Sequence, residues 1–435
     1  MAYKTVSDVA DADLCLSCGT CESVCPASAI NLEISKKSIY EPIINHDKCI
    51  NCKMCLKVCP GISVDFEELN NDVFDKQPDI TWIGNFVKCY LGNSRDEIIR
   101  YNSTSGGMVT QILDFLLEKG IIDGALVTGM SKDRPLEPNP FIARTKDEIL
   151  SAAVSKYCPV PLNRVLKKIM NEEGKFAVVG LPCHIHGIRM LEKTNRNLRD
   201  KIVLHIGLLC SHTVNFNGTE FLLAKKNIQK KDIVKLSYRG NGWPGRMSIR
   251  YKDGSGTSIP FDRNWFAYWT IFSPYFFTPL RCITCTDLTA ELADISLGDA
   301  WLPELMNDTV GMSIVISRTE KSESILNNMC DENKIYIRGI HHEDVKRSQG
   351  FNIKYKKLDL GDRMLLLSSS KHNIPYYNPS PSAISSLVRR IRNLFVIFNV
   401  KISSRKKFMK YLVKVPIPIF RLYTGVSKVL YDLDS

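Results

Sequence analysis

Short apolar runs alternate with helix-like segments through the middle of the chain. Between Gly107 and Gly120, apolar residues recur every three or four positions, which predicts an amphipathic helix that ends at the second glycine. Strand-like runs lie at residues 125–127, 175–180, 202–209 and 293–298. This alternation predicts an α/β domain in which crossover helices join parallel strands.

A cysteine-rich motif occurs twice near the beginning of the chain. CLSCGTCESVCP, residues 15–26, recurs as CINCKMCLKVCP, residues 49–60, displaced by 34 positions. The sequence has 15 cysteines, and it shows neither the apolar core of a secretion signal nor an apolar run of the about 20 residues that cross a bilayer. We therefore expect a protein inside the cell, where disulfides are rare and clustered cysteines indicate metal or redox chemistry.

The spacing within the repeated motif predicts two [4Fe-4S] clusters. Three thiolates at positions i, i+3 and i+6 bind one cluster, and the fourth cysteine, followed by proline, reaches the other cluster. Structural zinc is the alternative, but zinc sites use pairs of cysteines. The segment resembles bacterial two-cluster ferredoxins over about 60 residues. The predicted ligands are Cys15, Cys18, Cys21 and Cys59 for the first cluster, and Cys49, Cys52, Cys55 and Cys25 for the second.

Four other cysteines stand where a further metal site is expected. Cys183 and Cys210 each follow a predicted strand, and the carboxyl ends of strands are where open α/β sheets bind ligands. Together with Cys282 and Cys285, they suffice for a third [4Fe-4S] cluster, although zinc or burial in the core would use the same residues. Nearby histidines are candidate ligands, cofactor contacts or structural residues: His184, His186, His205 and His212. The remaining cysteines are interpreted as packing residues: Cys89, Cys158 and Cys330.

Two loops have the composition of cofactor-binding loops. Small residues from Ser103 to Gly107 precede the predicted helix, where backbone N–H groups and the helix dipole favour a phosphate. The same residues would also make an ordinary N-cap. The loop SYRGNGWPG offers Tyr238 and Trp243 as stacking faces and Arg239 as a charge, which suits a flat ring with an anionic tail. A core turn anchored by the tryptophan is the alternative.

Several motifs in order resemble those of the family of coenzyme F420 hydrogenase/dehydrogenase beta subunits: RYNSTSGGMVT, SKYCP, VGLPCHIHG, GLLCSH, YRGNGWPG and CITCTDLTAELADISLGD. The resemblance runs from about Val87 to Arg318. It implies a flavoprotein that carries FAD and a proximal [4Fe-4S] cluster and exchanges hydride with the 5-deazaflavin coenzyme F420. Two features depart from the pattern: Cys158 in SKYCP, where the family more often has another residue, and the basic C-terminal segment.

The resemblance also implies roles for particular residues. Cys183, Cys210, Cys282 and Cys285 become ligands of the proximal cluster. The FAD site and further cofactor contacts are expected at Ser105, Gly106, Gly107, Lys156, Tyr157, Arg239 and Trp243. Because a hydride carries two electrons and each cluster takes one, the flavin is the expected converter between them. Candidates for holding the anionic tail of the coenzyme, or else solvated surface residues, are Lys156, Arg189, Arg239 and Arg246.

Two other functions stay open at the level of sequence. Relatives also occur without the deazaflavin, in cell-envelope polysaccharide pathways, and a non-enzymatic electron-transfer subunit would carry the same cysteines. In each case we expect a redox partner protein or subunit. We expect three parts: a small α+β ferredoxin-like domain at 1–75, an α/β flavin and iron-sulfur domain with a mixed or parallel sheet at 76–375, and a basic appendage at 376–435.

The formal charge of +12 is concentrated at the end of the chain. From Ala383 to Ser435, 11 Lys and Arg stand against two Asp, so this segment carries +9 and the rest about +3. The body therefore does not have the charge of a nucleic-acid binder. The basic residues alternate with apolar runs, which predicts either a peripheral contact with the cytoplasmic face of a membrane or helices packed on the body or on a partner. The cations are Arg389, Arg390, Arg392, Arg405, Lys406, Lys407, Lys410 and Lys414.

Overall fold

An eight-stranded sheet forms the centre of the protein in the computed structural model, which describes residues 3–261, 273–382, 386–404 and 406–432. Arg405 of the predicted cations therefore lies outside the described residues. The strands lie in the order β14 (Ile335–Ile340), β4 (Lys88–Ser94), β13 (Ser313–Ser317), β12 (Ile295–Asp299), β8 (Ile202–Leu208), β7 (Phe176–Gly180), β5 (Gly124–Met130) and β6 (Pro138–Ala143).

The middle of this sheet has the predicted parallel arrangement. Strands β5, β7, β8 and β12 are parallel neighbours, and they contain the four runs that the sequence pattern identified. Strand β6 pairs with β5 in the antiparallel sense at one edge, and β13, β4 and β14 add three antiparallel pairings at the other. The domain is therefore a mixed α/β fold, as expected.

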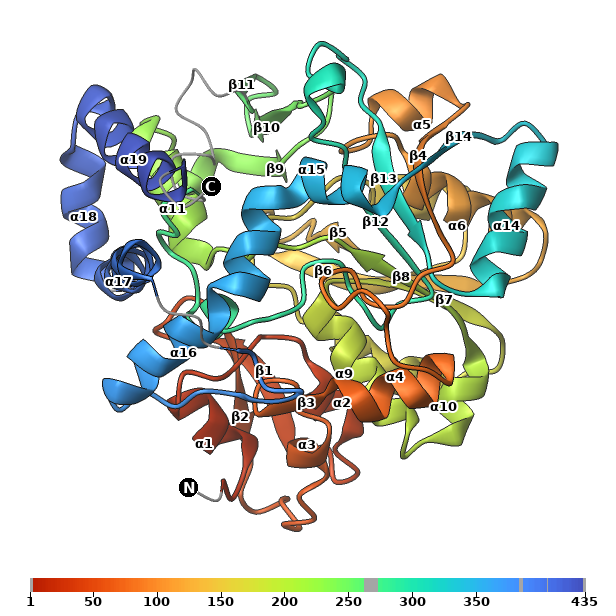
Figure 1. Cartoon of the computed structure of the whole chain (residues 1–435), viewed down its shortest axis with the longest axis horizontal. Coiled ribbons are helices and arrows are strands. Elements are labelled where there is room, and N and C mark those ends of the chain that lie inside the picture. Colours follow the sequence, from red (N-terminus) through yellow and green to blue (C-terminus); the bar gives the residue numbers. More distant parts are fainter. Residues whose placement is uncertain (1–2, 262–272, 383–385, 405, 433–435) are drawn as a thin grey trace.

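Helices cover both faces of the sheet (Figure 1). Residues of β5 alternate between the two cores: Ala125 and Val127 pack with α6 (Met108–Glu118) and α14 (Glu320–Asp331), whereas Leu126 packs with α9 (Pro182–Glu192). A strand buried on both sides needs apolar residues at every position, which explains the continuous apolar runs. The predicted helix between Gly107 and Gly120 is α6.

The N-terminal domain contains the repeated cysteine motif. Its elements are α1 (Val6–Asp11), α2 (Thr20–Val24), the hairpin of β1 (Ile30–Ile34) and β2 (Tyr40–Ile44), α3 (Met54–Lys57), β3 (Ser63–Asp65) and α4 (Phe66–Phe74). The backbone repeats with the sequence: Ser17 and Asn51, at equivalent positions, are both left-handed, as are Gly19 and Lys53. Within each repeat, the two left-handed residues turn the chain so that successive cysteines face one point.

The two repeats differ in what they contact. Gly19 has a φ of +90°, and a Cβ atom at this residue would lie 2.7 Å from the backbone nitrogen of Arg164 in the sheet domain. Next to it, the Asn163 N–H donates to the Cys18 carbonyl at 2.9 Å. The equivalent residue of the second repeat, Lys53, is exposed. Only the first repeat therefore packs directly against the sheet domain at this turn.

Replacing Gly19 by alanine is expected to destabilise the protein by more than about 2 kcal/mol, because left-handed strain and the contact with Arg164 add. The matched control is Lys53→Ala, which keeps an L residue in the same backbone conformation but in solvent. Apparent midpoints of thermal unfolding measure both variants. An equal decrease of the unfolding midpoint in the two variants would contradict the assigned packing of Gly19.

The C-terminal segment packs against both other parts of the chain. Strand β15 (Tyr376–Asn378) pairs with β3 of the N-terminal domain, and helix α17 (Leu387–Ser403) packs beside α16 (Leu360–Ser369). Helices α18 (Lys406–Lys414) and α19 (Ile417–Asp432) follow at the left of Figure 1, next to α11 (Phe216–Lys225). Arg392 of α17 is buried and pairs with the buried carboxylate of Asp359 at 2.6 and 2.9 Å. Arg392 is therefore a core residue and not a surface cation.

Candidate functional site

A cavity of about 340 Å³ opens at the carboxyl ends of the parallel strands. Its walls include Thr128 near the end of β5 and the last residues of three other strands, Gly180, Leu208 and Asp299. This is the edge of an open α/β sheet where ligands bind, and the volume lies within the range of small-molecule and cofactor sites. A second cavity, of about 1240 Å³, shares the wall formed by residues 153–156 and Arg239.

The predicted small-residue loop lies at this cavity, at the N-terminus of α6. Ser105 and Gly107 line the cavity. The Ser105 hydroxyl lies 2.7 Å from that of Ser313 on β13, and the Gly106 N–H donates to the same oxygen at 3.1 Å. A Cβ atom on Gly106 would lie 2.4 Å from the Gly92 carbonyl, so glycine is required for this close approach. The loop thus joins two strands while its small residues face the cavity.

The YRGNGWPG loop builds the opposite wall around one carboxylate. Arg239 is buried and binds both oxygens of Asp299, at 2.7 and 3.0 Å, and the Trp243 indole N–H donates to Asp299 at 2.9 Å. Tyr238 is fully buried, and its hydroxyl lies 2.8 Å from that of Thr219; it does not line this cavity but belongs to the wall of the second one. Arg239 lines the cavity, whereas Trp243 supports it from behind, packed against Trp301.

The other predicted cofactor contacts, Lys156 and Tyr157, also line the cavity. The Lys156 ammonium donates to the carbonyls of Ala153 and Val154, both at 2.8 Å, and burial lowers the pKa of this lysine to about 7. The Tyr157 hydroxyl accepts from Arg239 at 3.2 Å. The structure therefore brings both residues to the site that the small-residue loop forms.

Two predicted anion-binding residues lie away from the cavity wall. Arg189 is buried in an ion network on α9, and Arg246 is an exposed residue of β10 (Arg246–Tyr251) that donates to Ser258 at 3.3 Å. Neither belongs to the residues that line either described cavity. The structure therefore does not bring these two predicted residues to the site.

The cysteines of the repeated motif gather in two places. Burial raises the pKa of Cys15, Cys18, Cys21 and Cys59, in the last case to about 12. Repulsion from other thiols of the group raises the pKa of Cys15, Cys21 and Cys59 further. We call these four the first thiol site. Cys25 is buried with Cys49 and Cys55 packed around it, and the pKa of Cys55 is raised by burial and by Cys52 and Cys25. We call these four the second thiol site.

Cysteines from three separate segments form a third thiol site: Cys183, Cys210, Cys282 and Cys285. Cys183 lies in the first turn of α9, directly after β7, and Cys210 follows β8. Burial raises the pKa of Cys183 well above its ordinary value, and repulsion from Cys18, Cys210, Cys282 and Cys285 adds to the shift. The four thiols are therefore near one another, and Cys18 of the first thiol site is near them.

Four soft donors at each place fit a [4Fe-4S] cluster. Within the described part of the chain, no three Cys, His, Asp or Glu side chains lie as close together as the ligands of one metal ion. Cys89, Cys158 and Cys330 lie in apolar cores, as expected.

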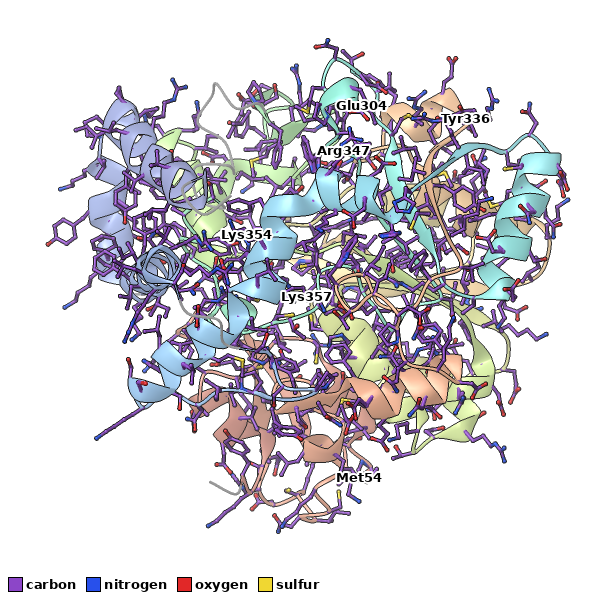
Figure 2. The ribbon with its side chains drawn as sticks, viewed as in Figure 1. Met54, Glu304, Tyr336, Arg347, Lys354 and Lys357 are labelled. Atoms are coloured by element: carbon purple, nitrogen blue, oxygen red, sulfur yellow. The ribbon has the colours of Figure 1, made fainter. Side chains whose placement is uncertain are left out.

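Two buried cations lie beside the thiols and were missed in the sequence. Lys356 is 2% exposed, and its ammonium donates to the Asp287 carbonyl at 2.7 Å. Burial alone would lower the pKa of Lys356, but Cys285, Cys210, Asp287 and Cys282 raise it above its ordinary value. Lys356 is on a π-helical turn, Lys354–Leu358, whose members Lys354 and Lys357 are labelled in Figure 2. No motif distinguishes Lys356 from its lysine neighbours.

Arg281 is the second buried cation. It donates to the carbonyls of Gly61 and Pro60, at 2.9 and 2.8 Å, directly after Cys59 of the first thiol site. Its own neighbour in sequence is Cys282 of the third thiol site. Cys282 and Cys285 are among the groups that raise the pKa of Arg281 against the effect of burial. Arg281 therefore joins the N-terminal domain to the loop that carries half of the third thiol site.

The four candidate histidines are buried, and three of them lie outside the network that contains Arg189. His184 pairs with the Val160 carbonyl at 2.9 Å, and burial lowers its pKa to about 4. His186 pairs with Asp287 at 2.8 Å. His212 lines the cavity and packs against Tyr275, and burial, with Lys356 nearby, lowers its pKa to about 3. His184 and His212 are therefore neutral near pH 7.

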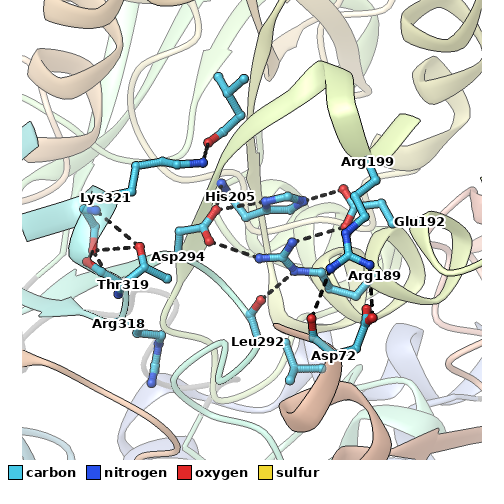
Figure 3. Close-up of polar contacts among 12 residues, drawn as sticks. Asp72, Arg189, Glu192, Arg199, His205, Leu292, Asp294, Arg318, Thr319 and Lys321 are labelled. Carbon is cyan, nitrogen blue, oxygen red and sulfur yellow. Dashed lines mark hydrogen bonds and ion pairs between the residues drawn. The ribbon is translucent and has the colours of Figure 1, made fainter. Parts of the chain in front are cut away.

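His205 belongs to the buried ion network of Figure 3. Its ring nitrogens lie 2.8 Å from Glu192 and 3.0 Å from Asp294, and Arg189 contacts the same two carboxylates, each at 3.2 Å. Burial and the charge of Arg189 oppose protonation of His205, but Glu192 and Asp294 outweigh them and raise its pKa. The network fixes α9, and with it Cys183, against β8 and β12.

Replacing His205 by glutamine is expected to cost about 3 kcal/mol near pH 6 and less near pH 9. A histidine whose pKa is raised on folding contributes stability that is full below its unfolded pKa of about 6.5 and is lost as the pH rises through the folded pKa. Apparent unfolding midpoints across this range measure the effect, with exposed His46→Gln as the control. If the stability lost in His205→Gln increased with pH, the raised pKa of His205 would be contradicted.

Three models of known protein families match parts of the chain. Residues 14–61 match the family described as 4Fe-4S dicluster domain. Residues 89–167 match the N-terminal family, and residues 173–343 the C-terminal family, of the coenzyme F420 hydrogenase/dehydrogenase beta subunit. The last two matches together span more than half of the chain.

Individual relatives agree with these matches. The chain is 30% identical to coenzyme F420 hydrogenase subunit beta of Methanothermobacter thermautotrophicus over 56% of its length and 81% of the relative's. It is 28% identical to a subunit of the F(420)H(2) dehydrogenase of Methanosarcina mazei, over 76% and 86%. Its fold is similar to a chain of the F420-reducing [NiFe] hydrogenase complex from Methanosarcina barkeri, with a TM-score of 0.52, 24% identity, and 67% and 94% coverage.

A mixed α/β domain with these relatives, preceded by a 4Fe-4S dicluster domain, defines an iron-sulfur oxidoreductase. The chain belongs to the family of coenzyme F420 hydrogenase/dehydrogenase beta subunits. The resemblance seen in its motifs is thereby confirmed.

Proposed function

We propose that this chain is an iron-sulfur flavoprotein that exchanges hydride with coenzyme F420 through FAD and passes single electrons to three [4Fe-4S] clusters. The observation that carries the proposal is the position of Cys210. This cysteine lines the cavity at the strand ends and also belongs to the third thiol site. A cofactor in the cavity would therefore share a wall with a cluster on these thiols.

The residues of the cavity fit the parts of FAD. The N-terminus of α6, with Ser105 and Gly107 at the cavity, would hold a phosphate, because unpaired N–H groups and the helix dipole favour negative charge there. Tyr157 and Arg239 would form the wall for the ring system. When bound, FAD supplies conversion between two-electron hydride chemistry and one-electron transfer. The adjoining 1240 Å³ cavity is the proposed entrance for the hydride donor.

The three thiol sites adjoin one another in a fixed order. Cys183 of the third site is near Cys18 of the first, and Cys21 of the first is near Cys55 of the second. The series thus begins at the cavity and continues through the third, the first and the second thiol site, toward the far end of the N-terminal domain. We propose that the second site, where Cys52 is exposed, is the place at which a redox partner docks.

Anaerobic mixing with reduced coenzyme F420 and a one-electron dye tests the proposal. The expected result is bleaching of a bound flavin followed by reduction of the dye. Bleaching with NADH instead of reduced F420 would assign the flavin to another hydride donor. If the purified protein contained no flavin, the proposed enzymatic activity would be contradicted, and a non-enzymatic electron-transfer subunit would be the remaining function.

A further inference from the structure

The outer face of helix α17 is apolar and exposed. Leu387, Ile391, Leu394 and Phe398 recur every three or four residues, so they lie on one side of the helix, and they are 75, 46, 50 and 56% exposed. The opposite side, with Val396 and Val400, is buried against the body. The fold therefore uses only one of two apolar faces of this helix.

Helix α19 shows the same division. Ile419, Leu422, Val426 and Val429 recur at helical spacing and are 58, 76, 45 and 55% exposed. Phe420 faces the other way and is buried with Phe221 and Phe276. We call the two rows of exposed apolar residues on α17 and α19 the apolar stripes. Eight large apolar side chains exposed on two neighbouring helices exceed what scattered surface residues explain.

The charge around the apolar stripes has a single sign. From Ser386 to Tyr431 the sequence contains no Asp or Glu. Arg389 and Arg392 of the predicted cations point inward to Asp359, and the side chain of Lys406 lies outside the described residues. Among the side chains that the structure describes in this segment, the exposed cations are Arg390, Lys401, Lys407, Lys410, Lys414 and Arg421.

We propose that α17, α18 and α19 attach this protein to the surface of a membrane that contains anionic lipid. An apolar helix face flanked by cations lies in the interface, with the apolar side chains below the headgroups and the cations among them. A protein partner is the less suitable occupant, because the cores of protein interfaces are depleted of lysine. None of the described helices has the length and apolar composition to span a bilayer. The attachment is therefore peripheral, and it is independent of the proposed flavin chemistry.

Flotation with lipid vesicles tests the proposal on the full-length, anaerobically purified protein. The wild type is expected to float with vesicles of phosphatidylcholine and phosphatidylglycerol, to stay behind with phosphatidylcholine alone, and to be released by high salt. A charge variant, Lys407→Gln with Lys410→Gln and Lys414→Gln, is expected to bind about a hundredfold more weakly, since each cation contributes about fivefold. A stripe variant, Phe398→Ser with Leu422→Ser, should also lose binding.

The matched control removes three exposed lysines elsewhere, Lys168→Gln with Lys175→Gln and Lys252→Gln, and should bind like the wild type. Iron content and circular dichroism verify that every variant is folded. Absence of wild-type flotation, or equal binding by the charge variant and the control, overturns the proposal. Self-association of the wild type that the stripe variant abolishes would assign the apolar stripes to a second copy and would overturn it as well.

Discussion

Replacing Cys282 by alanine is expected to lower the iron content of anaerobically purified protein from about twelve to about eight atoms per chain. Cys282 is one of four thiols at the third thiol site, and a cubane that lacks one of its protein ligands is held weakly. Flavin should remain, because Cys282 does not line the cavity. Reduced F420 should then still bleach the flavin, while reduction of the one-electron dye is lost.

Cys330→Ala is the matched control, since Cys330 is a half-buried cysteine in an apolar core away from the thiol sites. Its iron content should equal that of the wild type. Iron and sulfide analysis, with electron paramagnetic resonance of the reduced protein, measures both variants. If the wild type contained only about eight irons per chain, the third cluster would be contradicted. If Cys282→Ala had the same iron content as the wild type, Cys282 would not be a cluster ligand.

Lys356→Met should lower the reduction potential of the cluster at the third thiol site by on the order of 100 mV. Lys356 is a buried cation whose charge acts on Cys210, Cys282 and Cys285. A unit charge a few ångströms away contributes about 2 to 4 kcal/mol at the dielectric of a protein site, and a tenfold change in a one-electron equilibrium is about 59 mV. Without the ammonium, adding an electron to this site becomes less favourable.

A potentiometric titration monitored by electron paramagnetic resonance measures this shift directly. Lys356→Arg keeps the charge and should keep most of the potential. Lys354→Met, two residues earlier on the same turn, removes an equal charge and should leave the potential unchanged. Equal potentials in Lys356→Met and the wild type would show that this lysine serves only the structure.

The strands and the small-residue loop at the site were predictable because their signals are local. Continuous apolar runs predict strands buried on both faces, and the carboxyl ends of parallel strands must meet at one edge. Cys183 and Cys210 follow from these two rules, and Ser105 and Gly107 follow from the small residues that precede a predicted helix. The repeated motif was visible for the same reason, since its spacing lies within one loop.

The partners of buried ions were not predictable, because they join segments far apart in the sequence. Asp299 holds both Arg239 and Trp243, yet the sequence places it in an ordinary strand end. Tyr238 and Trp243 are aromatic residues of a loop, and composition cannot tell a stacking face from an anchor in the core. Likewise, the amphipathic pattern of α17 showed that it has an apolar face, but not which element Arg392 would contact.

The pairing of β15 with β3 has a consequence for how the dicluster domain works. This pairing ties the segment that precedes the C-terminal helices to the N-terminal domain, and Arg281 fastens the same domain from the sheet side. A carrier held at both points is a stationary conductor and cannot swing between donor and acceptor. On the proposed function, the rate of electron transfer within the chain should be independent of solvent viscosity, and only docking of the external partner should slow in a viscous solution.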